Sequence, residues 1–296
     1  MRAKDNRTYY ADGAVSGRPN RHPGIWLLLL LFCLAGAWLG QNRLGNQTAP
    51  VNNVLSNAES VAPSGQPSGK WPGRLLADSE ALFAWRRYQQ ELQEAAGEIR
   101  VAVYCTHSSE TYTSYSGQPK VYGELGGIYQ AAHAFAETLQ AEGVGVFVDE
   151  TIHDWPDWNK AYANSLATAE GLLAAYPNLQ VLIDWHRDAG VSREASVVEI
   201  NGRTAARIML VCGSAQRYEN ANWQSNRDFM QKLGDKMEEL YPGLLRRISV
   251  QAGRYNQHIF DHAILVEMGS TENNIDEVEY AATLLAEAMR QVLAEE

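Results

Sequence analysis

Four residues whose side chains can bind a metal ion or move a proton follow apolar runs of this sequence. His107 and Glu110 lie three positions apart, shortly after a run that begins at Ile99. His186 follows the segment LQVLIDW, and Glu267 follows AILV. Imidazole and carboxylate groups both suit zinc, and two histidines with one glutamate and an open position form a known catalytic set. The residue types therefore favour a metal site that includes His107 and Glu110.

Buried strands are the elements that must position these residues. Short apolar runs at 99–104, 179–185 and 263–266 have the composition of strands that are covered on both faces. Parallel strands of an open α/β sheet end at one edge, where such folds build their sites. Three strands that each end in a metal-binding or acid–base residue would therefore gather those residues in one crevice.

Helical periodicity separates the strands. The pattern predicts helices over 128–142, 159–176, 223–241 and 275–293, strands over 144–148 and 248–251, and a hairpin of 197–200 and 207–211 around Asn201-Gly202. Strands that alternate with helices of this length predict an α/β fold. We expect a mostly parallel sheet with helices on both faces.

The first part of the chain has a different composition. Residues 1–24 are basic and poor in apolar side chains, which predicts a disordered cytoplasmic tail. Residues 25–40, IWLLLLLFCLAGAWLG, carry no charge and have a tryptophan near each end. They predict a single-pass transmembrane anchor that places the rest of the chain outside the cytoplasm. The alternative is a cleaved signal peptide, because Ala35-Gly36-Ala37 resembles a cleavage site.

Residues 41–97 connect that anchor to a globular region at 98–296. They begin rich in Asn, Gln, Ser, Pro and Gly, which is linker composition, and helical spacing over 78–94 suggests a stalk. The net charge of −10 argues against a nucleic-acid partner. The three cysteines form no C-x-x-C pair, which argues against a disulfide scaffold or a thiol-rich metal site.

The region from Ile99 to Glu296 resembles the stage II sporulation protein P family. The matching segments are YCTHSSETY, YPNLQVLIDWHRDA, NANWQSNRDF, GRYNQ and AILVEMGSTENNIDEVEYAA. Members of this family are membrane-anchored peptidoglycan hydrolases that resemble zinc-dependent N-acetylmuramoyl-L-alanine amidases. The resemblance implies an amidase/zinc-carboxypeptidase-like catalytic domain that cleaves the amide bond between N-acetylmuramic acid and L-alanine, with stem-peptide cross-links as a second candidate substrate. It implies a role in sporulation and engulfment. It also implies sister sporulation cell-wall proteins as partners, including a glycan-cleaving enzyme.

The same resemblance assigns roles to the four residues. His107 and His186 correspond to the family's histidines, Glu110 to the acidic residue of the first motif, and Glu267 to the glutamate of its E-x-G motif. Zn²⁺ would be bound by His107, Glu110 and His186, and Glu267 would be the general base. Cys105 stands where the family usually has a histidine, which predicts slower or differently regulated catalysis.

Four more residues have two interpretations each. Glu124 is an alternative zinc ligand to Glu110, since related amidases often have a ligand glutamate on such a loop. Asp184 either orients a ligand imidazole or caps its loop. Arg187 either binds a substrate carboxylate or pairs with a nearby aspartate. Asn273 either shapes the E-x-G loop or caps the last helix.

The activity itself has alternatives. A chain that has lost catalysis would be a cell-wall binding adaptor, and H-x-x-E with a distant His and Glu also suits a zinc carboxypeptidase-like enzyme. An amidase would release whole stem peptides from peptidoglycan, whereas a carboxypeptidase would release single amino acids. The segment HDWPDW at 153–158 is interpreted as a loop whose aromatic residues could line a glycan groove.

Overall fold

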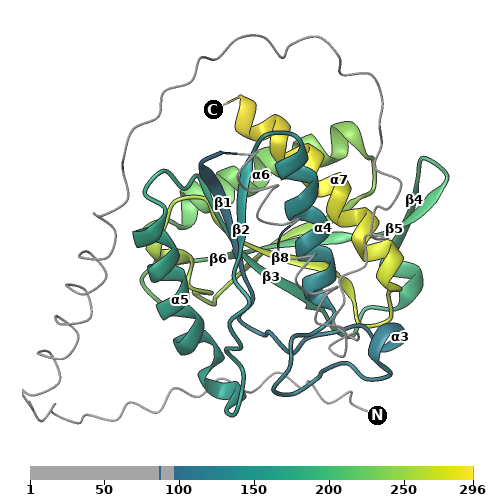
Figure 1. The fold of residues 1–296 in the computed structure, drawn as a ribbon. Coiled ribbons are helices and arrows are strands. Elements are labelled where there is room, and N and C mark those ends of the chain that lie inside the picture. Colours follow the sequence, from purple (N-terminus) through teal and green to yellow (C-terminus); the bar gives the residue numbers. More distant parts are fainter. Residues whose placement is uncertain (1–86, 88–96, 296) are drawn as a thin grey trace, which may run out of the picture. The chain divides into compact units, whose positions relative to one another are not determined.

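A six-stranded sheet forms the centre of the computed structural model, which describes residues 87 and 97–295 (Figure 1). In pairing order its strands are β2 (Gly145–Val148), β1 (Ile99–Tyr104), β3 (Val181–Asp188), β8 (Ala263–Ser270), β6 (Ile208–Gly213) and β7 (Leu245–Gln251). Every pairing is parallel except that of β6 with β8. The predicted α/β fold with a mostly parallel sheet is confirmed.

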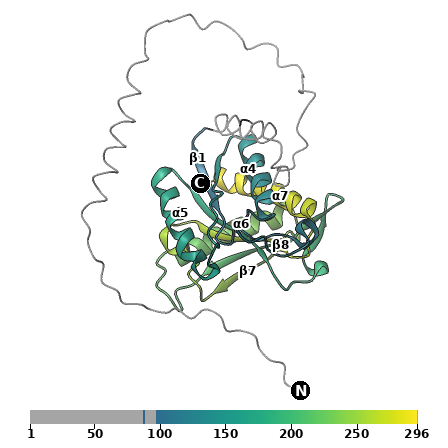
Figure 2. The same ribbon diagram turned by 60° about the horizontal axis from the view of Figure 1, so that its bottom comes forward.

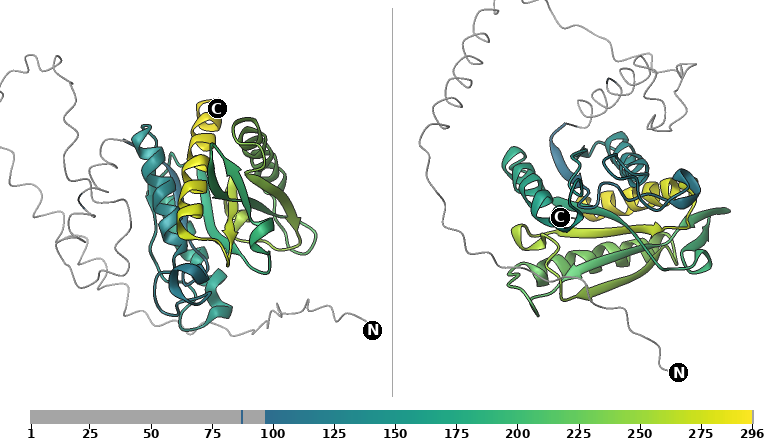
Figure 3. Two further views of the ribbon diagram at one scale, coloured as in Figure 1. Left: turned by 90° about the vertical axis from the view of Figure 1, so that its right-hand side faces the viewer. Right: turned by 90° about the horizontal axis from the view of Figure 1, so that it is seen from below.

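Helices cover both faces of this sheet. α4 (Ile128–Ala141), α7 (Ile275–Ala294) and α6 (Trp223–Leu240) pack on one face, with α7 between the other two (Figure 3). α5 (Ala161–Ala175) packs on the other face, on the far side of β1 from α4 (Figure 2). Each of these helices was predicted to within two residues of its bounds. The short helical segments are α3 (Thr113–Ser116), η1 (Trp158–Lys160), η2 (Arg193–Ala195) and η3 (Gln257–Ile259).

Side-chain alternation along β3 separates two unequal environments. Ile183 and Trp185 are fully buried in the large apolar core beneath α4, α6 and α7. Leu182 belongs to the smaller apolar cluster beneath α5. Because successive side chains of a strand point to opposite faces, Asp184 and His186 lie on the α5 side with Leu182. The α5 side of the sheet therefore combines a thin apolar layer with buried polar groups.

Two predicted strands end later than the sequence suggested. β3 continues through Asp188 and β8 through Ser270, so His186 and Glu267 lie within their strands and not in the loops that follow. The strands continue because β3 and β8 pair along this length, with His186 opposite Glu267 and Asp188 opposite Ser270. The polar residues at these strand ends were predicted to lie in loops, because only the pairing of β3 with β8 extends the strands over them.

The predicted hairpin had the wrong second strand. β4 (Val197–Ile200) pairs with β5 (Arg203–Ala206), and 207–211 belongs instead mainly to β6 in the central sheet. Asn201 and Gly202 both have positive φ, as a two-residue hairpin turn requires, so the second strand must begin directly after them. Every residue of β6 is buried, which suits a central strand and not an exposed ribbon.

Some predictions lie outside the described residues. These are the tail at 1–24, the anchor at 25–40, and nearly all of the linker and stalk at 41–97. In the part of the chain that the structure describes, no helix has both the length and the apolar character to cross a membrane. The anchor therefore stays a prediction.

Candidate functional site

His186 and Glu267 lie side by side near the carboxyl ends of β3 and β8. Their Cα atoms are register partners, and the alternation of both strands directs their side chains to the α5 side of the sheet. His186 is 3% exposed. Oε2 of Glu267 is buried and has no hydrogen-bond partner within the described residues. The two strands therefore hold an imidazole and a carboxyl group in one sheltered place.

The loop after β1 brings His107 and Glu110 to the same place. The Glu110 amide donates to the His107 carbonyl at 3.0 Å, which closes a turn and sets the two side chains near each other. Glu110 Oε2 lies 3.6 Å from His186 Nδ1, and the rings of His107 and His186 stand edge to face with centroids 5.3 Å apart. The structure thus gathers His107, Glu110 and His186 beside Glu267.

Burial and neighbouring charges set the protonation of this cluster. Burial, with a contribution from His186, lowers the pKa of His107 to about 3, so its imidazole is neutral at pH 7. Burial alone would raise the pKa of Glu110, but the interactions with His186 and Arg187 lower it to about 2. Burial also opposes the charged form of His186, yet Asp184 and Glu110 raise its pKa well above 6.5. The carboxylates of Asp184 and Glu110 therefore favour a positive charge at the position of His186 between them.

The spacing and burial of the donor atoms bear on whether these residues fit zinc. Two ligand atoms on one tetrahedral zinc ion, each about 2.1 Å from it, are about 3.4 Å apart. The 3.6 Å between Glu110 Oε2 and His186 Nδ1 is close to this value. Nδ1 of His107 is buried with no hydrogen-bond partner in the described residues, as a ligand atom without its metal would be. Within residues 97–295, however, no group of three His, Cys, Asp or Glu residues forms a complete metal-binding arrangement. The donor chemistry fits zinc, with two donors at ligand spacing.

Asp184 contacts the candidate ligand His186. Its Oδ1 lies 2.9 Å from His186 Nε2, without the alignment of a hydrogen bond. It also accepts hydrogen bonds from the Thr106 amide at 2.8 Å and the Thr106 hydroxyl at 2.7 Å. Both of its predicted roles are therefore compatible with the structure, since it contacts the imidazole and holds the start of the first loop.

Arg187 holds that loop from the other side. Its Nε donates to the Thr111 carbonyl at 3.0 Å and its Nη2 to the Pro119 carbonyl at 2.8 Å. Nη1 lies 3.6 Å from Glu110 Oε1. With 4% exposure the guanidinium is enclosed by the protein, so these contacts favour the structural interpretation. The expected aspartate partner was wrong, because Glu110 is the paired carboxylate.

Asn273 and Glu124 complete the predicted set. Asn273 Oδ1 accepts from the Ser270 amide at 2.8 Å and closes the turn after β8, while Asn274 is the residue that caps α7. Asn273 therefore shapes the loop after the E-x-G motif. Glu124 is exposed on the loop at 117–127. Glu110 and not Glu124 contacts His186, although the choice of zinc ligand stays a prediction.

Sequence reasoning missed two side chains at the site. The Trp158 ring stacks on the His107 ring with centroids 3.8 Å apart and an interplanar angle of 1°. Lys120 Nζ lies 2.9 Å from the centroid of the same Trp158 ring. The aromatic content of HDWPDW was a signal for Trp158. Lys120 had none, because its loop reaches the site only through tertiary contacts.

Other reactive side chains have structural environments. Cys105 is a buried free thiol whose pKa is raised, chiefly by burial, which makes it a poor nucleophile. His153 contacts the Cys105 carbonyl and the Thr168 hydroxyl, each at 2.8 Å. His133 pairs with Glu150 at 3.0 Å. These contacts agree with packing roles for His133 and His153.

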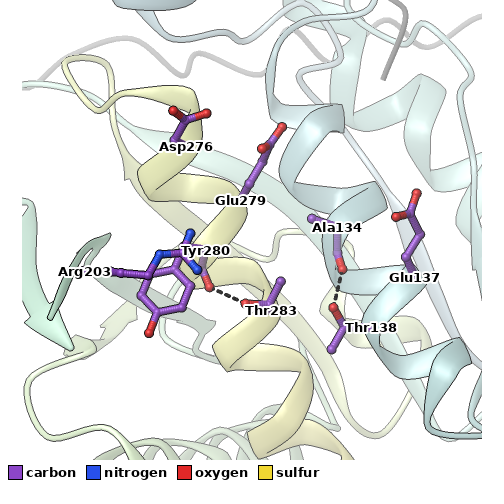
Figure 4. Close-up of a pocket in the computed structure, with 8 residues that line it drawn as sticks. All are labelled: Ala134, Glu137, Thr138, Arg203, Asp276, Glu279, Tyr280 and Thr283. Carbon is purple, nitrogen blue, oxygen red and sulfur yellow. Dashed lines mark hydrogen bonds between the residues drawn. The ribbon is translucent and has the colours of Figure 1, made fainter. Parts of the chain in front are cut away.

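A separate pocket of about 370 Å³ lies between α4 and α7 (Figure 4). Arg203 and Tyr280 border it, as do the acidic side chains of Glu137, Asp276 and Glu279. It contains none of the predicted site residues. Because α4 and α7 cover the other face of the sheet, this pocket is distinct from the site at His107 and His186.

Solved amidase structures resemble the chain. The N-acetylmuramoyl-L-alanine amidase from Clostridium difficile 630 has 20% identity and a TM-score of 0.42, and the match covers 67% of this chain and 96% of that one. The amidase Ami1 from Mycobacterium smegmatis has 14% identity and a TM-score of 0.44, and the match covers 68% of this chain and 99% of that one. The CwlD amidase from Clostridioides difficile, solved in complex with the GerS lipoprotein, has 10% identity and a TM-score of 0.45, and the match covers 67% of this chain and 100% of that one.

Sequence comparison identifies the family. The stage II sporulation protein P of Bacillus subtilis (strain 168) is 26% identical over an alignment of 221 residues, and the match covers 68% of this chain and 53% of that protein. The chain thus matches about half the length of this curated relative. A family model described as Stage II sporulation protein P (SpoIIP) matches residues 46–290, which is most of the chain. The chain therefore belongs to the stage II sporulation protein P family.

Proposed function

We propose that this chain is a zinc-dependent peptidoglycan hydrolase that cleaves the amide bond between N-acetylmuramic acid and L-alanine. The observation that carries the proposal is the convergence of His107, Glu110 and His186 beside Glu267. Membership of the stage II sporulation protein P family supports a role in cell-wall remodelling during sporulation.

His107, Glu110 and His186 would hold the metal. A zinc ion there supplies Lewis-acid activation of the amide carbonyl and of the attacking water. His107 is neutral and Glu110 is ionised, so both present lone pairs, whereas His186, whose pKa is raised, would release a proton as the metal binds. Asp184 positions the His186 imidazole and is itself held by Thr106.

Glu267 would take the proton from the attacking water and donate it to the leaving amine. Burial raises the pKa of Glu267 to about 8, and Glu110 and Asp188 act in the same direction. A bound cation favours the ionised form of a neighbouring carboxyl group and so lowers this pKa. A carboxyl group whose pKa lies near the working pH can both accept and donate the proton.

The proposed location rests on the apolar segment before the hydrolase domain, and the proposed partners rest on the family resemblance. The apolar segment at 25–40 would anchor the protein in the cell membrane with the hydrolase domain on the outer side, next to peptidoglycan. Sister sporulation cell-wall proteins, including a glycan-cleaving enzyme, would act with it on the same wall.

Product analysis tests the proposed reaction. The full chain, purified in detergent and supplied with zinc, should release whole stem peptides from purified peptidoglycan and leave peptide-free glycan, as identified by mass spectrometry. Bound zinc should be about one ion per chain. Release of single amino acids would identify a carboxypeptidase instead. Zinc-loaded protein that binds the wall but releases nothing would be an adaptor.

A further inference from the structure

Two exposed aromatic side chains lie on the loops next to the candidate site. Tyr122 is 61% exposed and Trp155 is 54% exposed. The Trp155 ring lies against Gly123, since a Cβ atom at that glycine would be 3.5 Å from ring atom Cδ2. Tyr122, which precedes Gly123, and Trp155 are therefore neighbours on two touching loops, 117–127 and 149–160. Large exposed apolar groups that cluster in this way often mark a binding surface.

The two loops touch again closer to the site. Lys120 of the first loop lies over the ring of Trp158 of the second, at 2.9 Å from its centroid. Trp158 in turn stacks on His107, one of the proposed zinc ligands. The two loops that carry Tyr122 and Trp155 thus reach His107 through Lys120 and Trp158. A ligand bound across both loops would extend to the place where the proposed reaction occurs.

Backbone contacts hold the first loop in a defined position. The Val121 amide donates to the Ser109 carbonyl at 2.9 Å, and the Gly126 amide donates to the Ser108 carbonyl at 2.7 Å. A Cβ atom at Gly126 would lie only 1.8 Å from the Glu110 carbonyl oxygen, so only glycine allows this approach. The loop is therefore fastened directly to the turn that carries His107 and Glu110.

The second loop is fastened to the same turn. Asp154 Oδ2 accepts from the Ser109 amide at 3.1 Å and from the Ser109 hydroxyl at 2.5 Å. The Ser108 hydroxyl donates to the Thr151 carbonyl at 3.2 Å. Because both loops are attached to one turn, the aromatic groups keep their position relative to the site. Preorganised groups of this kind reduce the entropy lost when a ligand binds.

We propose that Tyr122 and Trp155 form a saccharide platform that binds sugar rings of the glycan strand while the attached amide bond lies at the catalytic site. The face of an aromatic ring carries negative charge density, which attracts the weakly positive C–H groups on the face of a pyranose ring. Asp157 and Asn159 follow Trp155 on the second loop and carry carboxylate and amide groups that can hydrogen-bond sugar hydroxyl and acetamido groups. A substrate made of amino sugars matches both features. This proposal rests on the proposed function, whose substrate it specifies.

Binding of a peptide-free saccharide tests the platform. Chitohexaose, six linked N-acetylglucosamine units, is titrated into the full chain in detergent, and Kd is measured by calorimetry. Trp155→Ala and Tyr122→Ala should each raise Kd about three- to tenfold, the value of one aromatic contact. Trp223→Ala is the matched control, because Trp223 is a partly exposed tryptophan at the start of α6, beneath Arg227, outside both loops. Its Kd should equal that of the unmodified chain.

The results separate the platform from the reaction. Exposed positions tolerate truncation, and equal melting temperatures would verify that the variants fold. On peptidoglycan, Trp155→Ala should raise KM and leave kcat unchanged. Unchanged Kd in both aromatic variants, or no binding of chitohexaose by the unmodified chain, would overturn the platform even if stem peptides are released. Weakened saccharide binding in the variants, without stem-peptide release by the unmodified chain, would support the platform and contradict the proposed reaction.

Discussion

The two faces of the central sheet use polar groups differently. On the α4–α6–α7 face, β3 contributes Ile183 and Trp185 to a large apolar core. On the α5 face the same strand contributes Asp184 and His186, which contact other ionisable groups. A large core on one side provides the stability with which the protein can keep buried, partly unsatisfied polar groups on the other. Neighbouring residues of β3 thus serve stability on one face of the sheet and chemistry on the other.

The largest expected effect is on the apolar face. Trp185 is fully buried and contacts Phe135 of α4 with ring centroids 5.3 Å apart. Trp185→Ala should lower the free energy of unfolding by about 3–5 kcal/mol, because it removes a large side chain and leaves a cavity. Urea denaturation of the purified chain measures this. His186→Ala, one position along on the other face, should lose activity with a smaller loss of stability. The reverse pattern would contradict the division between faces.

Metal binding on the α5 face distinguishes the two candidate glutamates. Glu110→Ala should abolish binding of zinc by the purified chain, because Glu110 contacts His186 and its lowered pKa keeps its carboxyl group ionised. Glu124→Ala should keep zinc, since Glu124 is exposed on its loop. Zinc content measured by plasma emission spectroscopy checks both, with His133→Ala as a histidine control. Retained zinc in the first variant and lost zinc in the second would reverse the assignment.

Removal of the proposed base should affect chemistry alone. Glu267→Gln keeps the size of the side chain but cannot accept the proton from water. Stem-peptide release should fall about 10²-fold or more, the usual contribution of a general base, while zinc and peptidoglycan binding persist. Turnover assays and metal analysis of the same sample test this. Loss of zinc would make Glu267 a ligand, and near-normal turnover would exclude it as the base.

A smaller effect on the free energy of unfolding is expected at Glu277, an ionised side chain of α7 that contributes to stability. Glu277 is the third residue of α7, where it forms a capping box with Asn274 and pairs with Arg193 and Asn273. Burial works to raise the pKa of Glu277, but Arg193 and Asn273 lower it below 4.5. The stabilisation is therefore present above pH 4.5 and is lost as the pH falls through the lowered value. Glu277→Gln should cost about 1 kcal/mol at pH 7.

Denaturation curves at two pH values test this sign. The difference between Glu277→Gln and the unmodified chain should shrink as the pH falls below 4.5, because the native carboxylate is then protonated as well. Asp276→Asn is a control in the same helical turn, since Asp276 is exposed, and its effect should be smaller at pH 7. An effect of Glu277→Gln that does not depend on pH would show that packing and not charge is responsible.

The sequence by itself determined the periodic elements and the residues that can do chemistry. Helices such as α4 and α7 were predictable because their apolar residues recur at helical spacing, a local property of the chain. Buried strands carrying His186 and Glu267 were recognisable from their apolar runs, although not their ends. The pair Asn201-Gly202 located the hairpin turn, since these two residue types readily adopt the positive φ that such a turn requires.

The tertiary structure decided which of these groups meet. Arg187 pairs with Glu110, 77 positions away, and not with the aspartates near it in sequence. Trp158 stacks on His107 because the loop after β2 is tied to the turn after β1 by Asp154. Residues 208–211 joined the central sheet because β6 pairs with the edge of β8 that β3 does not occupy. Such contacts depend on strand order and loop closure, which no local pattern of residues contains.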